Sequence, residues 1–138
     1  TCERGGVSGL TLLMGAARYG HERMVELLLR HGADVNLQSS KGGSALQRAA
    51  GQGHERVAVL LLQHGAQVNL QSSDGATALL GAAASGHERV AALLLEHGAE
   101  VDMQSSSGWT ALMLAAGCGH ERVVELLLQR GAAISKQS

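Results

Sequence analysis

The chain has 138 residues, a hydrophobic fraction of 45% and a formal net charge of -1, which suits a globular chain with an apolar core. This near-neutral charge excludes the basic surface that nucleic acid or anionic lipid requires, and one Trp plus one Tyr cannot form a base-stacking platform. No apolar run approaches the roughly 20 residues that span a bilayer. Because Phe is absent and only one Trp and one Tyr are present, the core must be built from Leu, Val and Ala.

The cysteine content and the chain start bear on the cellular setting. Cys2 and Cys118 make no disulfide framework, and the sequence contains neither an Asn-x-Ser/Thr site nor a signal-peptide pattern. We therefore expect an intracellular, reducing environment. The chain begins at Thr1 rather than Met, so we also expect a piece of a longer protein.

A period of 33 residues runs through the whole sequence. Gly-His-Glu-Arg begins at Gly20, Gly53, Gly86 and Gly119, and Leu-Leu-Leu recurs with the same spacing. Segments 39–71 and 72–104 are identical at 21 of 33 positions. Such a period indicates a repeat architecture. We expect one domain over 1–138, with units at approximately 6–38, 39–71, 72–104 and 105–137 and with 1–5 as the remnant of a preceding unit.

The unit 39–71 illustrates the elements that we expect in each copy. It opens with turn-type residues at 39–43, and Ser44 can cap a first helix over 45–52. Within that helix Leu46, Ala49 and Ala50 share one face.

A second helix is expected from about His54 to about Gln63. Gly53 ends the first helix, Gly65 ends the second, and an extended tail over 66–71 leads to the next turn. Helices of about 8 to 10 residues are shorter than those that are stable alone. Each unit must therefore bury its apolar faces against other copies.

The unit resembles the ankyrin repeat, whose pattern of turn, Thr-Pro-Leu-His, Ala-Ala, Gly-His, Leu-Leu and Gly-Ala-Asp-Val-Asn it follows in order. The resemblance covers four units, nearly the whole chain. It implies an all-α solenoid in which helix-turn-helix units stack and are joined by hairpin-like loops.

The Thr-Pro-Leu-His tetrapeptide departs from the family in every unit. It reads Thr11-Leu-Leu-Met14, Ser44-Ala-Leu-Gln47, Thr77-Ala-Leu-Leu80 and Thr110-Ala-Leu-Met113. Because the family's histidine bonds neighbouring turns, we expect looser hairpins here. Gly15 and Gly81 stand inside first helices at about 1 kcal/mol each relative to Ala, so the first and third units should be softer.

The histidines and acids do not form a recognisable chemical site. Positions that recur at helix spacing do not converge on one metal ion, which favours structural roles. The segment His21-Glu22-Arg23-Met24-Val25 lacks the second histidine of HExxH, and no nucleophile–base pair is visible. We expect no enzyme, no metal and no cofactor. The repeated histidines are His21, His54, His87 and His120 at second-helix starts, with His31, His64 and His97 before a terminal glycine.

Positions that vary between units are candidates for contact with a partner. They fall at the turn tip and at the end of the first helix, and similarity to ankyrin domains implies that these parts line a concave surface that binds proteins. Both aromatic residues belong to this set, and such rings are common at binding hot spots, with local packing as the alternative. The candidates are Ser8, Leu10, Lys41, Asp74, Ser107 and Trp109 in turns, and Arg18, Tyr19, Gln52, Ser85 and Cys118 at helix ends.

Two functional hypotheses follow. The first is a protein-binding module for an unidentified partner. The second is a structural array, natural or engineered toward a consensus, or a fragment of a longer array without a dedicated partner. In that case uncapped ends could drive self-association, because 123–128 keeps an interior, apolar pattern where terminal repeats normally become polar.

The family resemblance also implies a possible covalent modification, hydroxylation of asparagine. Asn36 and Asn69 stand in a Leu-x7-Asn context, from Leu28 and Leu61, in which ankyrin-like tails can be hydroxylated on Asn. The alternative is a hydrogen bond within the tail, which we favour.

Overall fold

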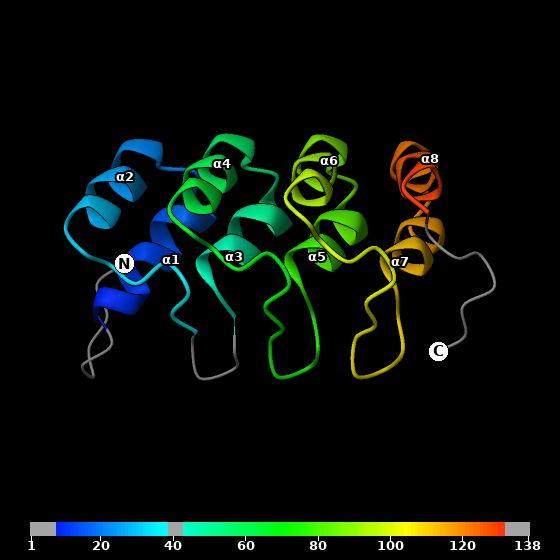
Figure 1. Cartoon of the computed structure of the whole chain (residues 1–138), viewed down its shortest axis with the longest axis horizontal. Helices are drawn as coiled ribbons and strands as arrows, with labels where there is room; N and C mark the ends of the chain where they lie inside the picture. Colours follow the sequence, from blue (N-terminus) through cyan, green and yellow to red (C-terminus); the bar gives the residue numbers. More distant parts are fainter. Residues whose placement is uncertain (1–7, 39–42, 132–138) are drawn as a thin grey trace.

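Eight α-helices in four consecutive pairs form the regular structure in the described residues, 8–38 and 43–131, of the computed structural model (Figure 1). This arrangement confirms the expected all-α fold. The helices are α1 (Ser8–Arg18), α2 (Glu22–Arg30), α3 (Ala45–Gln52), α4 (Glu55–Gln63), α5 (Ala78–Ser85), α6 (Glu88–Glu96), α7 (Ala111–Gly117) and α8 (Glu121–Gln129).

The pairs stack side by side in chain order. The first helices, α1, α3, α5 and α7, form one layer, and the second helices, α2, α4, α6 and α8, form the other (Figure 1). Each helix packs on its own partner and on the equivalent helices of the neighbouring pairs. The result is a solenoid, and the connecting turns before α5 and α7 project from the same side of it (Figure 1).

Helix starts and stops follow from local chemistry. The Ser44 hydroxyl accepts a hydrogen bond from the backbone N–H of Gln47 at 3.3 Å, and Thr77 and Thr110 cap α5 and α7 in the same way. At the other end, Gly53 has a φ of 78°, a left-handed conformation that favours glycine. The expected bounds of both helices in 39–71 are thus confirmed.

The start of α1 corrects one prediction. Ser8 and Leu10 were expected in a turn, but both lie within α1. Leu12 stands where the ankyrin pattern has proline, and a proline there would disfavour helical backbone at the residue before it. Without it, helical backbone extends upstream from Thr11.

The core is aliphatic, as the composition requires. Leu61, Leu94 and Leu127 of the second helices are fully buried, and so are Ala pairs of the first helices such as Ala49 and Ala50. Small Ala side chains let helices approach closely, so consecutive pairs pack without aromatic rings.

The tails join one helix pair to the next. The Asn36 side-chain amide donates to the Gly65 carbonyl at 3.1 Å, and its oxygen accepts from the Gln67 backbone N–H at 2.7 Å. Asn69 makes the equivalent bonds in the following pair. The expectation of a bond within the tail was therefore wrong, because the bonds cross to the following pair.

The tail is also less extended than expected. A turn interrupts it at 68–69, where the Leu70 backbone N–H lies 3.4 Å from the Gln67 carbonyl oxygen. The Asn69 side chain that bridges the pairs belongs to this turn.

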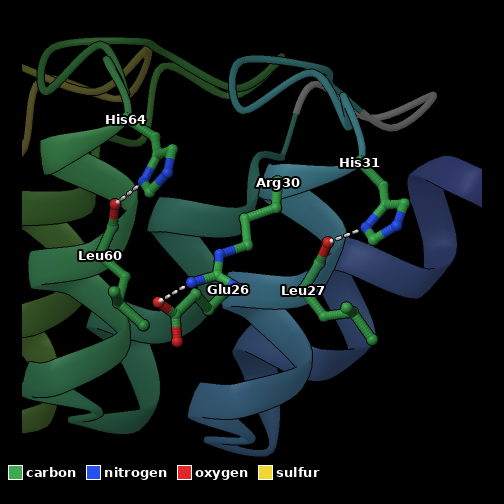
Figure 2. A network of polar contacts seen from close by, with 6 residues as sticks. All are labelled: Glu26, Leu27, Arg30, His31, Leu60 and His64. Atoms are coloured by element: carbon green, nitrogen blue, oxygen red, sulfur yellow. Dashed lines mark hydrogen bonds and ion pairs between the residues drawn. The ribbon is translucent and has the colours of Figure 1, made fainter.

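The histidines have two structural roles. His31 and His64 each donate from Nδ1 to a carbonyl one turn earlier in their own helix, at 2.9 Å (Figure 2). His97 makes the equivalent bond at 3.0 Å. His54 and His120 instead reach back to the preceding pair, where Nε2 lies 2.8 and 3.1 Å from a carbonyl oxygen near the end of the first helix.

Exposed ion pairs add little to these contacts. Arg30 lies 3.8 Å from Glu26 one turn away in α2 (Figure 2), and Arg56 lies 3.9 Å from Glu22 of the preceding pair. Exposed pairs of this kind are worth about 0–1 kcal/mol.

Candidate partner-binding surface

An open hollow of about 460 Å³ lies where the end of α1, the length of α3 and the turn before α5 meet. Its walls therefore come from three consecutive helix pairs. The lining residues are Arg18, Gly43, Gln47, Arg48, Gly51, Gln52, Ser72, Ser73 and Asp74. Three of the candidates from the sequence, Arg18, Gln52 and Asp74, are brought together here.

Gln47 fixes one wall of the hollow. Its side-chain amide nitrogen donates to the Leu70 carbonyl and to the Ala76 carbonyl, both at 2.9 Å. These two carbonyls flank the turn before α5, so one side chain of α3 holds both ends of that turn. Gln47 occupies the position of the missing family histidine, and in this pair it supplies bonds to the neighbouring turn.

Asp74 shapes the same turn from within. Its carboxylate accepts hydrogen bonds from the Ser72 hydroxyl and from the Ala76 backbone N–H, the latter at 3.2 Å. The Ser72 bond, followed by the Ala76 bond, lowers the pKa of Asp74 below its ordinary value of 3.8. Its backbone carbonyl accepts from both the N–H and the hydroxyl of Ser106, which joins this turn to the next one.

The hollow also holds two arginines. Arg18 lies at the exposed end of α1, with its guanidinium carbon 5.6 Å from the centroid of the Tyr19 ring. Arg48 is half-buried in α3. Within the described residues neither guanidinium forms an ion pair.

The other candidates from the sequence lie outside this hollow. Ser85, Ser107, Trp109 and Cys118 do not line it, although all four are exposed, Trp109 at 47%. Tyr19 is 63% exposed and lies beside the hollow through its neighbour Arg18. Lys41 lies outside the described residues. Tyr19 packs locally against Arg18, and its ring centroid lies 6.3 Å from that of His21, yet both Tyr19 and Trp109 keep about half or more of their surface exposed.

Sequence reasoning missed Gln47, Arg48 and the two serines of the turn. A signal for Arg48 was available, because the equivalent positions hold Gly15, Gly81 and Leu114. Only the second unit carries a charge there. Gln47 stands out in the same way, since Met or Leu occupies its position in the other units.

Metal-ligand clusters and membrane-spanning helices are both absent from the described residues. Those residues contain no group of three or more His, Cys, Asp or Glu side chains that could hold a metal ion. None of the helices in that part of the chain has the length and apolarity needed to cross a membrane. Cys118, which follows α7, is an exposed free thiol.

The comparisons with known proteins agree with the geometry. No curated protein gives a significant match. A family model described as ankyrin repeats (3 copies) matches residues 2–72 and 67–138, which together cover nearly the whole chain. Ankyrin repeats generally mediate protein–protein interaction. The stacked helix pairs, the repeated Gly-His contacts and this match lead to one conclusion: the chain belongs to the ankyrin repeat family.

Proposed function

We propose that this chain is a non-enzymatic protein-interaction module inside the cell. Its partner would bind the surface formed by the ends of the first helices and the turn tips. One observation carries the proposal: the hollow gathers Arg18, Gln52 and Asp74, three positions that differ between units, beside the exposed Tyr19. Variable polar positions around a hollow suit selective contact, whereas the recurring positions build the stack.

Tyr19 and Trp109 are the proposed anchors of this surface. Both are exposed, and aromatic rings bury a large area at low cost in side-chain entropy. Ser85, Ser107 and Cys118 are proposed contacts around them.

The experiment begins by recovering binding partners with the immobilised chain and measuring the affinity of the purified partner. Tyr19→Ala and Trp109→Ala should each weaken binding about tenfold, the equivalent of about 1.4 kcal/mol. Arg89→Ala, on the exposed start of α6 in the other helix layer, is the matched control and should leave the affinity unchanged. Equal losses in all three variants would refute the surface assignment.

A second candidate function, self-association by stacking, is favoured by the C-terminal end. Gly20, Gly53 and Gly86 are each covered by the ring of a histidine from the next helix pair. Gly119 has a φ of 78°, as Gly53 and Gly86 do, but a Cβ built on it would meet no atom of the described residues within 4 Å. Gly119 can therefore accept a histidine ring from another helix pair. By the 33-residue period, the exposed His21 of a second copy is the side chain equivalent to His54, His87 and His120.

Charge supports the same register. Glu22 pairs with Arg56 between the first two helix pairs. By the 33-residue period, Glu121 on the last pair and Arg23 on the first pair of a second copy are the corresponding residues, and both are exposed.

Sedimentation equilibrium tests head-to-tail stacking. Arg23→Glu and Glu121→Arg should each lower self-association, whereas the double variant should restore it because the pair is re-formed with opposite polarity. A wild-type chain that stays monomeric at every concentration, or a double variant as weak as the singles, would rule out this register.

A further inference from the structure

We infer that the hollow between α1, α3 and the turn before α5 binds a carboxylate side chain, so that the segment recognised here is acidic. The inference rests on the proposed interaction function and specifies the chemistry of its partner. It is carried by the two arginines of the hollow, Arg18 and Arg48, and by the hydrogen bonds and charge of Asp74 beside them.

Arg48 is the first element of this site. Its side chain is half-buried, and no carboxylate of the described residues neutralises it. Partial burial removes water from a guanidinium and strengthens its attraction to an anion. The planar fork of arginine also matches the geometry of a carboxylate, which it can bind through two parallel hydrogen bonds.

Arg18 supplies a second cation from the end of α1. Its contact with the face of the Tyr19 ring orients the guanidinium without using its N–H groups. Those donors remain for a ligand, and the aromatic ring beside them offers apolar surface to the stem of a Glu side chain.

Asp74 offsets only one of these two charges. Its Oδ1 atom accepts hydrogen bonds from Ser72 and Ala76, and within the described residues neither arginine forms an ion pair with it. Among the described lining residues, two guanidinium charges and one carboxylate leave a single positive charge, which suits a monoanionic carboxylate. A phosphate group of about −1.5 to −2 charge would exceed that balance.

The rest of the lining leaves room for a peptide backbone. A side chain at Gly51 would meet nothing within 4 Å, so the floor of the hollow is open over α3. The exposed side chains of Gln52 and Ser73 offer donors and acceptors at its rim. Gln47 is already bonded to the turn carbonyls, so the walls are formed before a ligand arrives.

Fluorescence anisotropy with labelled Gly-Ser octapeptides tests the inference. The probes carry two Glu, two Gln or two phosphoserine residues at the same positions. We expect the Glu peptide to bind at least fivefold more tightly than the Gln peptide, with affinity falling as salt rises. Amide NMR shifts caused by the Glu peptide should centre on Gly51 and Ser73.

Variants locate the effect in the hollow. Arg48→Gln and Arg18→Gln should each abolish the preference for Glu over Gln. Arg48→Lys, which keeps the charge but loses the fork, should retain part of that preference. Arg89→Gln in α6 is the matched control and should behave as wild type. Circular dichroism and the unfolding midpoint identify any variant that fails to fold, and Arg48→Lys then carries the test.

Each outcome separates this inference from the proposed function. A Gln peptide that binds as tightly as the Glu peptide, or a phosphoserine peptide that binds more tightly than both, would overturn carboxylate recognition. If none of the peptides shifts Gly51 or Ser73 while a recovered partner still depends on Trp109 and Tyr19, the interaction surface stands and the acidic ligand does not. If the recovered partner ignores both rings, the surface assignment itself fails.

Discussion

At the scale of single residues, a glycine and a histidine form the joint between neighbouring helix pairs. Gly86 has a φ of 78°, and a Cβ built on it would lie 2.6 Å from Nδ1 of His120. The same ring reaches the Ala84 carbonyl through its other nitrogen. The recurring Gly-His dipeptide is therefore explained by contact between pairs, since the glycine makes room for the histidine of the next pair.

Gly86→Ala should destabilise the chain by about 2 kcal/mol or more. The left-handed backbone costs a non-glycine residue roughly 1–2 kcal/mol, and displacing His120 loses a hydrogen bond of about 1 kcal/mol. Urea unfolding measures the change.

Gly81→Ala is the matched control and should have the opposite sign. Gly81 lies within α5, and an added Cβ would make only an ordinary contact, 3.7 Å from the Gly51 Cα atom. Alanine is favoured over glycine in a helix by about 1 kcal/mol, so the variant should be more stable by up to that amount. If both variants are destabilised equally, the explanation by backbone conformation and histidine contact is wrong.

The pKa of Asp74 can be changed through its hydrogen-bond donors. Ser72→Ala removes the larger cause of the lowered pKa, so the pKa should rise toward 3.8, while the Ala76 bond keeps it from reaching that value. Because the folded pKa is depressed, the ionised carboxylate stabilises the turn above the unfolded pKa, and this contribution is lost as pH falls through the folded pKa. NMR titration of the side-chain carboxyl carbon gives both values. An unchanged pKa in the variant would contradict the assigned cause.

At the scale of elements, Gln47 shows how one side chain can replace a missing motif residue. The expectation of looser hairpins assumed that nothing replaces the family's histidine. In the second unit the Gln47 amide bonds the carbonyls on both sides of the next turn. The other units carry Met14, Leu80 and Met113 there, and a thioether or alkyl side chain has no N–H to donate.

Gln47→Met should therefore lower the unfolding free energy by about 1–2 kcal/mol, because two partly buried carbonyls lose their donor. Amide exchange should also speed up in the turn between Ser72 and Ala76. Gln52→Met, the same substitution at the exposed end of α3, is the control and should be close to neutral. An equal effect at both positions would mean that the two hydrogen bonds do not hold the turn.

Local signals made most of the elements predictable. Ser44 as a cap, Gly53 and Gly65 as ends, and the Leu and Ala spacing fixed α3 and α4 from the sequence, because each signal acts within one helix turn of its target. The start of α1 was missed because Leu12, unlike a proline, does not end helical backbone on its N-terminal side.

The candidate site was only partly predictable. Comparing units identified Arg18, Gln52 and Asp74, but it could not place them in one hollow, because the walls come from three helix pairs. The bonds of Gln47 join residues 23 and 29 positions apart, and those of Asn36 span 29 and 31. Such long-range pairs depend on the packing of the stack and have no local pattern in the sequence.

At the scale of the whole molecule, the stability of each helix pair depends on its immediate neighbours in the stack. Each helix pair packs only on its neighbours, so an interior pair has two interfaces and a terminal pair has one. A pair cannot be stable alone, since its helices have only 7 to 11 residues. Loss of an interior pair should therefore uncouple everything on both sides of it, whereas loss of a terminal pair should leave the rest stacked.

Leu61 and Leu127 test this consequence, because both are fully buried leucines at equivalent positions of α4 and α8. Leu→Ala at such sites removes about 2–5 kcal/mol. In Leu127→Ala, hydrogen exchange should accelerate in α7 and α8 while α3 to α6 stay protected. In Leu61→Ala, protection should fall throughout α1 to α8, because α3 and α4 carry the coupling between both halves. Uniform loss of protection in both variants would instead describe a single cooperative unit, and exchange measured by mass spectrometry decides between the two.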